Sequence, residues 1–202
     1  MSEPADLQPL VNAFLADDRP ALDGYMAGNG ATLAGLIWNP ALTDCPEQPL
    51  AHALSHWLAI RGDADLPPVS AVSPFDLRPA LGFILLIDVI DDGRDGRFRL
   101  YGTKVAEMYG EDMTGRLVSE VGGNNYMTRL MRALYRAALL RRQAVFSHHL
   151  PPPHVSVTAW KRLILPLTGP DGAVIRFLSV NLPGAWRPAP MQRRPLPMED
   201  GA

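Results

Sequence analysis

The sequence predicts an α+β fold, in which helices cover one face of a five-stranded antiparallel sheet and an N-terminal helical extension precedes it. Three observations favour this class. Two strand-like runs flank an Asp/Gly-rich loop at residues 91–96, which suits a hairpin. An amphipathic helix is predicted over residues 125–142. Three more strand-like runs, separated by Pro- and Gly-rich turns, follow that helix.

The composition is that of a globular protein with one core. The chain has 202 residues, of which 47% are hydrophobic and 20% charged. No apolar run reaches the length of a membrane span, and the N-terminus lacks the features of a secretory signal. The single cysteine, Cys45, excludes an internal disulfide and a multi-cysteine metal site. A cytoplasmic protein without membrane contact is therefore expected.

The net charge of −2 is unevenly distributed. Residues 1–65 hold nine acids and two bases, which gives −7, whereas residues 66–202 hold twelve acids and seventeen bases, which gives +5. These halves could attract one another within one chain or across a dimer. No basic tail of the kind that binds nucleic acid is visible, so no nucleic-acid partner is expected.

Residues 1–62 are predicted to form the helical extension. Apolar periodicity and breakers indicate helical segments over residues 4–17, 20–27, 32–38 and 46–61. The first segment carries one apolar stripe, formed by Leu7, Leu10, Val11, Phe14 and Leu15. The stripe is too apolar to face water, so it must pack on its own chain or on a second copy. A homodimer through this stripe is the prediction.

Residues 63–182 are predicted to form the sheet domain. A proline-punctuated connector over residues 66–79 leads into the opening hairpin, whose strands are residues 83–90 and 97–101. Short helices are expected near 105–109 and 117–121, before the long helix. The later strands are expected at residues 144–150, 155–167 and 174–182. Residues 183–202 are rich in Pro and charge and are expected to be a mobile tail.

Several short motifs in this order resemble a PAS domain, in particular a family of small single-domain PAS proteins from alphaproteobacteria. The resemblance spans residues 50–182 and includes the order of strand, hairpin, strand, short helices and longer helix. It is carried by residues 98–103 (FRLYGT), 109–110 (YG) and 112–116 (DMTGR), by Trp57 and residues 61–62, 66–67 and 73–77 (SPFDL), and by residues 163–167 (LILPL) and Gly172.

The resemblance implies a ligand pocket between the long helix and the inner sheet face. Its lining would include Ile87, Tyr101, Met108, Met113, Tyr126, Leu130, Leu134, Leu165 and Leu178. The alternative is that these side chains fill the space as an ordinary core, because residue type does not separate an apolar core from an apolar pocket. The sequence does not identify a cofactor.

Specific chemistries find little support in the sequence. A light-reactive flavin needs a cysteine on a pocket helix, and Cys45 lies outside the PAS-like region. The long helix has no histidine for haem, and His148 and His149 must face opposite sides of a strand. His52 and His56 are spaced as a metal pair, but no third ligand is evident. No hydrolase, P-loop or dinucleotide motif is found, so neither catalytic nor metal-binding residues are predicted.

The sequence therefore predicts a stand-alone, non-enzymatic PAS module in bacterial signal transduction, with its output through protein–protein contact and a small ligand as a candidate input. The competing class is a small-ligand or haem-binding protein, or a small enzyme, that uses the same cavity. A second partner hypothesis rests on Arg129, Arg132 and Arg136, which lie together on one helix face and suit an acidic surface. A solvated helix face explains the same row.

Overall fold

The computed structural model describes residues 7–122 and 125–187. Its helices are α1 (Gln8–Leu15), α2 (Arg19–Gly28), α3 (Gln48–Arg61), α4 (Thr103–Tyr109) and α5 (Tyr126–Arg141). Its strands are β1 (Thr32–Trp38), β2 (Ile84–Ile90), β3 (Asp95–Tyr101), β4 (Val145–Leu150), β5 (Trp160–Thr168) and β6 (Val174–Pro183). Short 3₁₀ turns join them, the longest over Pro74–Phe83. In this part of the chain no helix has the length and apolarity needed to cross a membrane.

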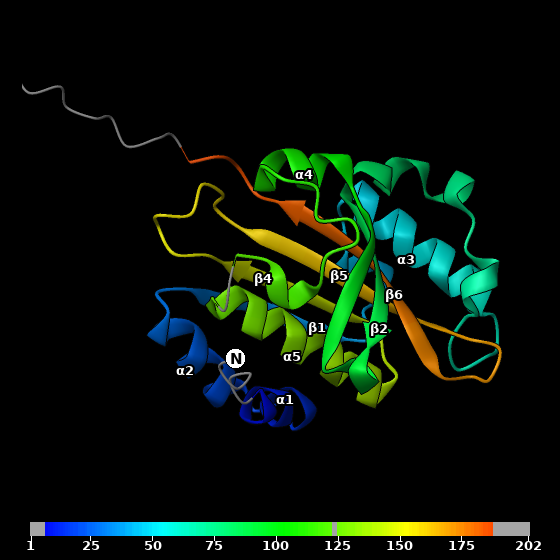
Figure 1. Cartoon of the computed structure of the whole chain (residues 1–202), viewed down its shortest axis with the longest axis horizontal. Helices are drawn as coiled ribbons and strands as arrows, with labels where there is room; N and C mark the ends of the chain where they lie inside the picture. Colours follow the sequence, from blue (N-terminus) through cyan, green and yellow to red (C-terminus); the bar gives the residue numbers. More distant parts are fainter. Residues whose placement is uncertain (1–6, 123–124, 188–202) are drawn as a thin grey trace, which may run out of the picture.

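The strands form one antiparallel sheet in the order β1-β4-β5-β6-β2-β3 (Figure 1). The hairpin predicted around residues 91–96 joins β2 to β3, and β5 and β6 form the last hairpin. The α+β class is confirmed. The sheet has six described strands, one more than predicted, because β1 adds to the β4 edge.

Strand β1 replaces a predicted helical segment. Leu33, Leu36 and Ile37 fit a helical spacing, but a seven-residue run is too short for periodicity to decide between helix and strand. The backbone of Thr32–Trp38 pairs along β4, with Leu33 opposite His149 and a register shift after it. The two strands are more than a hundred residues apart in the sequence. Their pairing satisfies the backbone polar groups of β1, so this non-local contact determines the conformation of the segment.

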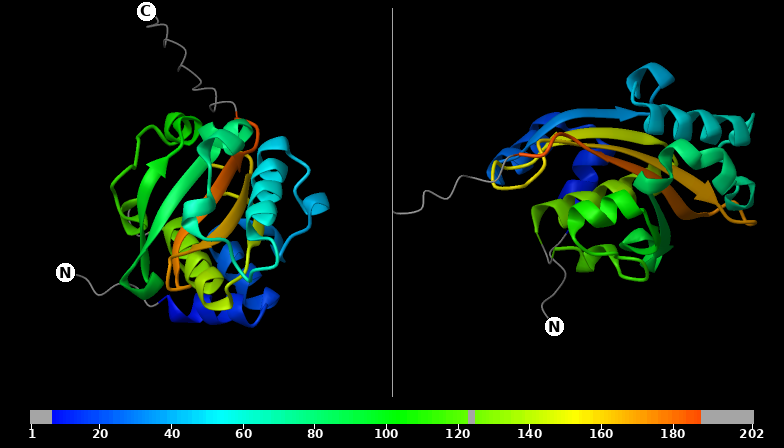
Figure 2. Two further views of the ribbon diagram at one scale, coloured as in Figure 1. Left: turned by 90° about the vertical axis from the view of Figure 1, so that its right-hand side faces the viewer. Right: turned by 90° about the horizontal axis from the view of Figure 1, so that it is seen from above.

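Helices cover both faces of the sheet (Figure 2). Helices α4 and α5 lie on one face, called here the inner face, and α3 lies on the other, the outer face. Trp57 of α3 is 2% exposed, and its Nε1 donates a hydrogen bond of 2.9 Å to the Pro166 carbonyl of β5. The predicted one-sided arrangement is therefore incomplete, because the apolar side of α3 covers the outer face.

The apolar stripe of α1 packs within its own chain, beside α5. Leu10, Val11 and Phe14 are buried, Leu7 is half-buried and Leu15 is 37% exposed. The prediction of a homodimer through this stripe assumed an apolar surface left open to solvent. Because α5 covers most of it, the stripe provides no such surface.

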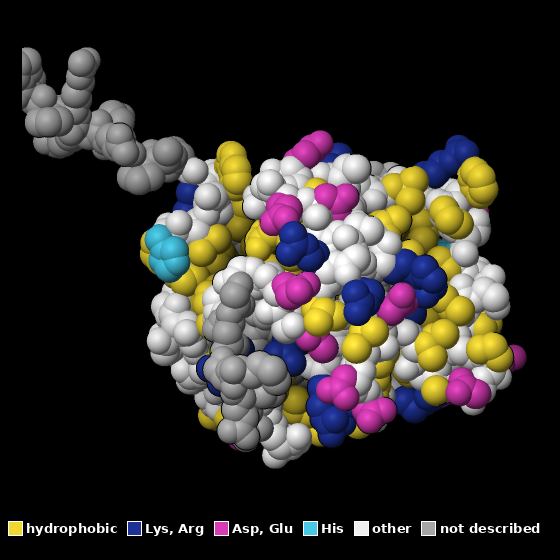
Figure 3. All heavy atoms as spheres, in the orientation of Figure 1, with side chains coloured by type: hydrophobic (Ala, Val, Ile, Leu, Met, Phe, Trp, Pro, Cys, Tyr) yellow, Lys and Arg dark blue, Asp and Glu magenta, His cyan; other side chains and the backbone are white. Residues whose placement is uncertain are grey.

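Ion pairs join the acidic first third of the chain to the basic remainder. Asp17 contacts Arg141 at 3.2 Å, Asp65 contacts Arg142 at 2.9 Å, and Glu47 pairs with Lys161. The charge asymmetry of the sequence is thus partly neutralised inside one chain. Acidic and basic side chains are interspersed on the face seen in Figure 3.

The segment after β6 is attached to the loop between β4 and β5. The Thr158 amide donates to the Ala185 carbonyl at 2.9 Å, and the Arg187 amide donates to the Ser156 carbonyl at 2.7 Å. The start of the predicted mobile tail is therefore ordered as far as Arg187. Residues 188–202 lie outside the described residues.

Candidate functional site

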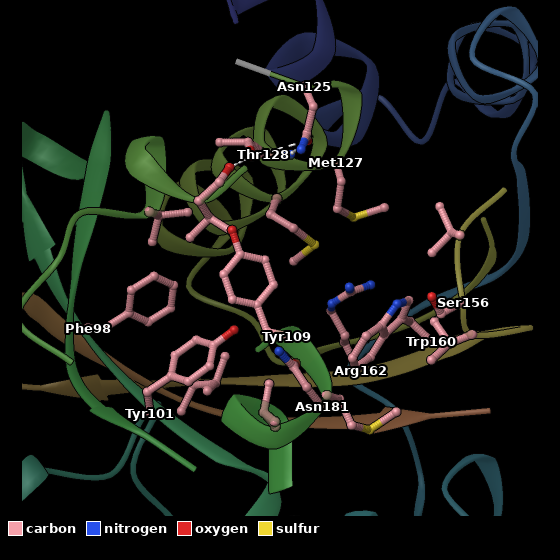
Figure 4. Close-up of a pocket in the computed structure, with 18 of the residues that line it drawn as sticks. Phe98, Tyr101, Tyr109, Asn125, Met127, Thr128, Ser156, Trp160, Arg162 and Asn181 are labelled. Carbon is pink, nitrogen blue, oxygen red and sulfur yellow. Dashed lines mark hydrogen bonds between the residues drawn. The ribbon is translucent and has the colours of Figure 1, made fainter. Parts of the chain in front are cut away.

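A cavity of about 270 Å³ lies between the inner face of the sheet and the N-terminal half of α5 (Figure 4). Helix α4 and the loop between β4 and β5 close its sides. Its walls are formed by Leu85, Phe98, Tyr101, Val105, Met108, Tyr109, Val118, Val121, Asn125, Met127, Thr128, Met131, Tyr135, Val155, Ser156, Val157, Trp160, Arg162, Asn181 and Trp186.

One side of α5 forms the upper wall. Met127, Met131 and Tyr135 are spaced by four residues and therefore lie on one face of the helix. The start of the helix is fixed by Asn125, whose Oδ1 accepts from the Thr128 amide at 2.9 Å. Thr128 Oγ1 in turn donates to the Val121 carbonyl at 2.5 Å. These bonds fix the first turn of α5 next to the cavity.

The polar floor comes from the two central strands. Arg162 of β5 and Asn181 of β6 are opposite each other in the register, and both side chains project into the cavity (Figure 4). Because side chains alternate along a strand, Leu165 and Leu178, three positions away, lie on the opposite, outer face. The implied placement of these two leucines in the pocket is therefore wrong.

Arg162 is a buried cation held by a neutral histidine. Its side chain is 6% exposed, and Nη1 lies 2.7 Å from Nδ1 of His149, which is 1% exposed. Burial, with Arg162 adding to it, lowers the pKa of His149 to about 2, so the imidazole is neutral and accepts the hydrogen bond at Nδ1. Burial also lowers the pKa of Arg162 to about 10, which leaves the guanidinium charged at neutral pH.

Tyrosines surround this cation and remain protonated. Burial raises the pKa of Tyr135 to about 12 and raises that of Tyr101 still further. The Tyr101 ring packs edge-on against Phe98, with ring centroids 5.0 Å apart. Both hydroxyls are therefore neutral hydrogen-bonding groups, and the aromatic rings supply apolar wall.

The rim of the cavity is aromatic and exposed. Tyr109 of α4 is 41% exposed and Trp186, beyond β6, is 60% exposed, although both line the cavity. Arg187 fixes this edge, because its guanidinium donates to the Pro151, Pro152 and Val155 carbonyls at 3.1, 2.5 and 2.9 Å. The loop between β4 and β5 and the end of β6 thus form one wall.

Of the nine residues implied by the resemblance, Tyr101 and Met108 line the cavity. Leu130 and Leu134 are buried but are displaced by one residue from Met131 and Tyr135, which is about 100° around a helix. The other residues outside the lining are buried Ile87, Met113, Leu165 and Leu178, and half-buried Tyr126. The resemblance did not indicate Arg162 or Asn181. The sequence signal that could have indicated Arg162 is its position, as a charged residue directly before the apolar run LILPLT.

The remaining histidines and the cysteine lie apart from the cavity. His52 Nε2 contacts the Asp76 carbonyl at 2.5 Å, and His56 Nε2 is buried without a hydrogen-bond partner. Burial raises the pKa of Cys45 to about 11, so its thiol is protonated. Within residues 7–122 and 125–187, no group of three or more His, Cys, Asp or Glu side chains could hold a metal ion.

The arginine row of α5 is engaged inside the molecule. Arg129 lies over the ring of Tyr25, 5.9 Å from its centroid. Arg132 donates to the Arg94 carbonyl at 2.9 Å and lies 3.7 Å from the Asp95 carboxylate. Arg136 lies against Gly93 in the turn between β2 and β3. These contacts tie α5 to α2 and to the hairpin.

A family model and a solved structure are similar to this chain. A family model described as PAS domain matches residues 46–181. No curated protein matches the chain. A solved structure, described as an RNA-binding Light-Oxygen-Voltage receptor, is similar at 16% sequence identity and a TM-score of 0.38, over 88% of this chain and 58% of that one. The chain therefore spans less than two thirds of that receptor. On the family match, which covers most of the sequence, the chain belongs to the PAS domain family.

Proposed function

We propose that this protein is a non-catalytic sensory module, which binds a small organic molecule in the cavity and passes the signal on by protein–protein contact. PAS domains are generally sensory or interaction modules, which supports the class. The observation that carries the proposal is the cavity between α5 and the sheet, with apolar walls and a small cluster of polar groups on its floor. Such a combination is typical of small-molecule sites.

The volume restricts the size of the ligand. About 270 Å³ lies just below the range of roughly 300–1,000 Å³ that is usual for ligand pockets. A molecule of one or two rings, or a short aliphatic chain, fits this space better than a large cofactor. Met127 and Met131 can adapt to the shape of such a molecule, because methionine side chains are flexible and polarizable.

The exposed rim supports an output by contact. Tyr109 and Trp186 face both the cavity and the solvent, so a ligand that touches them changes a surface that a partner can reach. Aromatic side chains are also enriched at protein interfaces. In this proposal the rim formed by α4 and the loop between β4 and β5 is the output surface, and the partner is a signalling protein.

A cavity-filling variant tests the binding proposal. Met131→Trp adds an indole inside the cavity, whereas Leu140→Trp adds one on the exposed side of the same helix, where Leu140 is 48% exposed. Binding of indole and of phenylacetate, measured by calorimetry or by amide NMR shifts, is expected for the wild type and for Leu140→Trp. Binding should be lost in Met131→Trp. Equal binding in both variants would place the site elsewhere, and no binding to the wild type would contradict a site for small ring compounds.

A further inference from the structure

We propose that the ligand of this cavity is an organic monocarboxylate, with its carboxylate on the Arg162 guanidinium and its apolar body along the methionine side of α5. The inference rests on the proposed function of the cavity and adds the chemical class of the ligand. It follows from three features: a buried cation without an acidic partner, the single charge in the cavity wall, and the neutral donors around it.

Arg162 has no carboxylate partner among the described residues. The ion pairs in residues 7–122 and 125–187 all involve other basic side chains. One guanidinium nitrogen bonds to the neutral His149, and the guanidinium carbon lies 5.2 Å from the centre of the Trp160 ring. A cation that is only 6% exposed costs free energy unless an anion or several acceptors compensate it. The donors of Arg162 that His149 does not use are on the cavity side, where a ligand can provide the missing anion.

The charge of the wall indicates a monoanion. Arg162 is the one charged residue among those that line the cavity, so a dianion would leave one negative charge uncompensated among mainly apolar walls. Asn181 lies opposite Arg162, and its Oδ1 accepts from Ser179 Oγ at 3.1 Å, which leaves its amide NH₂ toward the cavity. The planar guanidinium matches the two oxygens of a carboxylate, and the amide adds a further donor.

The opposite wall indicates an apolar body. Met127 and Met131 form the α5 side of the cavity, and Phe98 and Val105 form the side nearest the hairpin and α4. These side chains offer neither hydrogen-bond donors nor charge. An aryl or short alkyl chain attached to a carboxylate would contact them while the head group stays on the strand side.

The experiment compares an acid with its amide. The probes are phenylacetate, the isosteric neutral phenylacetamide, phenyl phosphate and acetate, and the measurement is the dissociation constant by NMR titration. Phenylacetate is expected to bind roughly 10- to 100-fold more tightly than phenylacetamide, the range that charge-assisted hydrogen bonds give. Phenyl phosphate, largely a dianion at pH 7.5, should bind more weakly than phenylacetate. Acetate, the head group alone, should bind weakly but saturably.

Variants then assign the preference to Arg162. Arg162→Met should remove the difference between acid and amide, and Arg162→Lys, which keeps the charge without the fork, should retain part of it. Arg176→Met is the matched control, because Arg176 is a strand arginine that pairs with Asp88 outside the cavity. It should leave all affinities unchanged. If Arg162→Met does not fold, the Lys variant and the acid–amide comparison on the wild type still decide.

Three results would overturn the inference in different ways. Equal affinity of phenylacetate and phenylacetamide, with Met131→Trp still blocking both, would reject the carboxylate and keep the cavity as a ligand site. Carboxylate binding that survives both Arg162→Met and Met131→Trp would place the anion elsewhere. A failure of every probe to bind the wild type would contradict the inference and the proposed function together.

Discussion

At the scale of single residues, the contact between Arg162 and His149 determines which ring nitrogen of the histidine carries the proton. The guanidinium donates to Nδ1, so the ring proton is on Nε2, which is buried without a partner in the described structure. Burial is the larger cause of the lowered pKa, and the positive charge of Arg162 adds to it. A neutral imidazole therefore lies against a buried cation. The protonation of His149 is coupled to folding.

This coupling predicts an acid-sensitive fold. Below pH 6.5, the ordinary pKa of histidine, the unfolded chain takes up a proton at His149 and the folded chain does not until about pH 2. The free energy of unfolding should thus fall as the pH drops from 6.5 toward 4, by up to about 1.4 kcal/mol per pH unit. His149→Gln keeps an acceptor for Arg162 and should flatten this slope. Exposed His154→Gln is the control, and equal slopes for all three proteins in urea unfolding would contradict the coupling.

Only part of this site could be predicted from the sequence. The helix that carries Met127, Met131 and Tyr135 could be predicted from its periodicity. Which side of this helix faces the cavity could not be predicted, because two apolar stripes lie one residue apart. Arg162 was missed for a physical reason. Charged residue types predict exposure, and only the pairing of β5 between β4 and β6 shows that this position is enclosed.

At the scale of elements, local patterns predicted some segments better than others. The helix α5 and the β2–β3 hairpin were predicted because their cap, turn and apolar residues all favour the same structure. Strand β1 was not, because its conformation depends on pairing with β4 far along the chain. The position of α3 on the outer face also depends on contacts between distant segments, such as that of Trp57 with Pro166.

Because Trp57 is buried between α3 and the outer face of the sheet, truncation of its side chain should cause a large loss of stability. Trp57→Ala leaves a cavity under α3 and should lower the free energy of unfolding by about 3–5 kcal/mol. Trp57→Phe keeps most of the ring volume but leaves the Pro166 carbonyl without its donor, so a loss of about 1–2 kcal/mol is expected. Urea unfolding measures both. A loss below about 1 kcal/mol for Trp57→Ala would show that α3 is not needed to cover the sheet.

At the scale of the whole molecule, the N-terminal extension is part of the fold. It provides an edge strand, covers the outer face and buries its apolar stripe beside α5. Its acidic residues meet basic residues of the later sequence, as in the Asp17–Arg141 and Asp65–Arg142 pairs. The apolar spacing predicted that the stripe must be covered, but it could not predict that α5 of the same chain covers it.

A charge placed in the stripe therefore tests the fold. Phe14 is 1% exposed, so Phe14→Asp buries an unpaired charge and should lower the free energy of unfolding by about 3 kcal/mol or more. Leu15→Asp, at the exposed neighbour, should change it by less than about 0.5 kcal/mol. Light scattering on both variants checks the mass. A dimer that dissociates in Phe14→Asp without loss of stability would contradict the intrachain packing.

Hydrogen–deuterium exchange with and without saturating phenylacetate tests the proposed signalling route most directly. In the proposed function, a ligand in the cavity changes the rim that a partner reaches. Slower exchange is therefore expected in residues 103–110 and 151–159, with α3 on the outer face unchanged. Saturating binding that leaves exchange in both rim segments unaltered would contradict the claim.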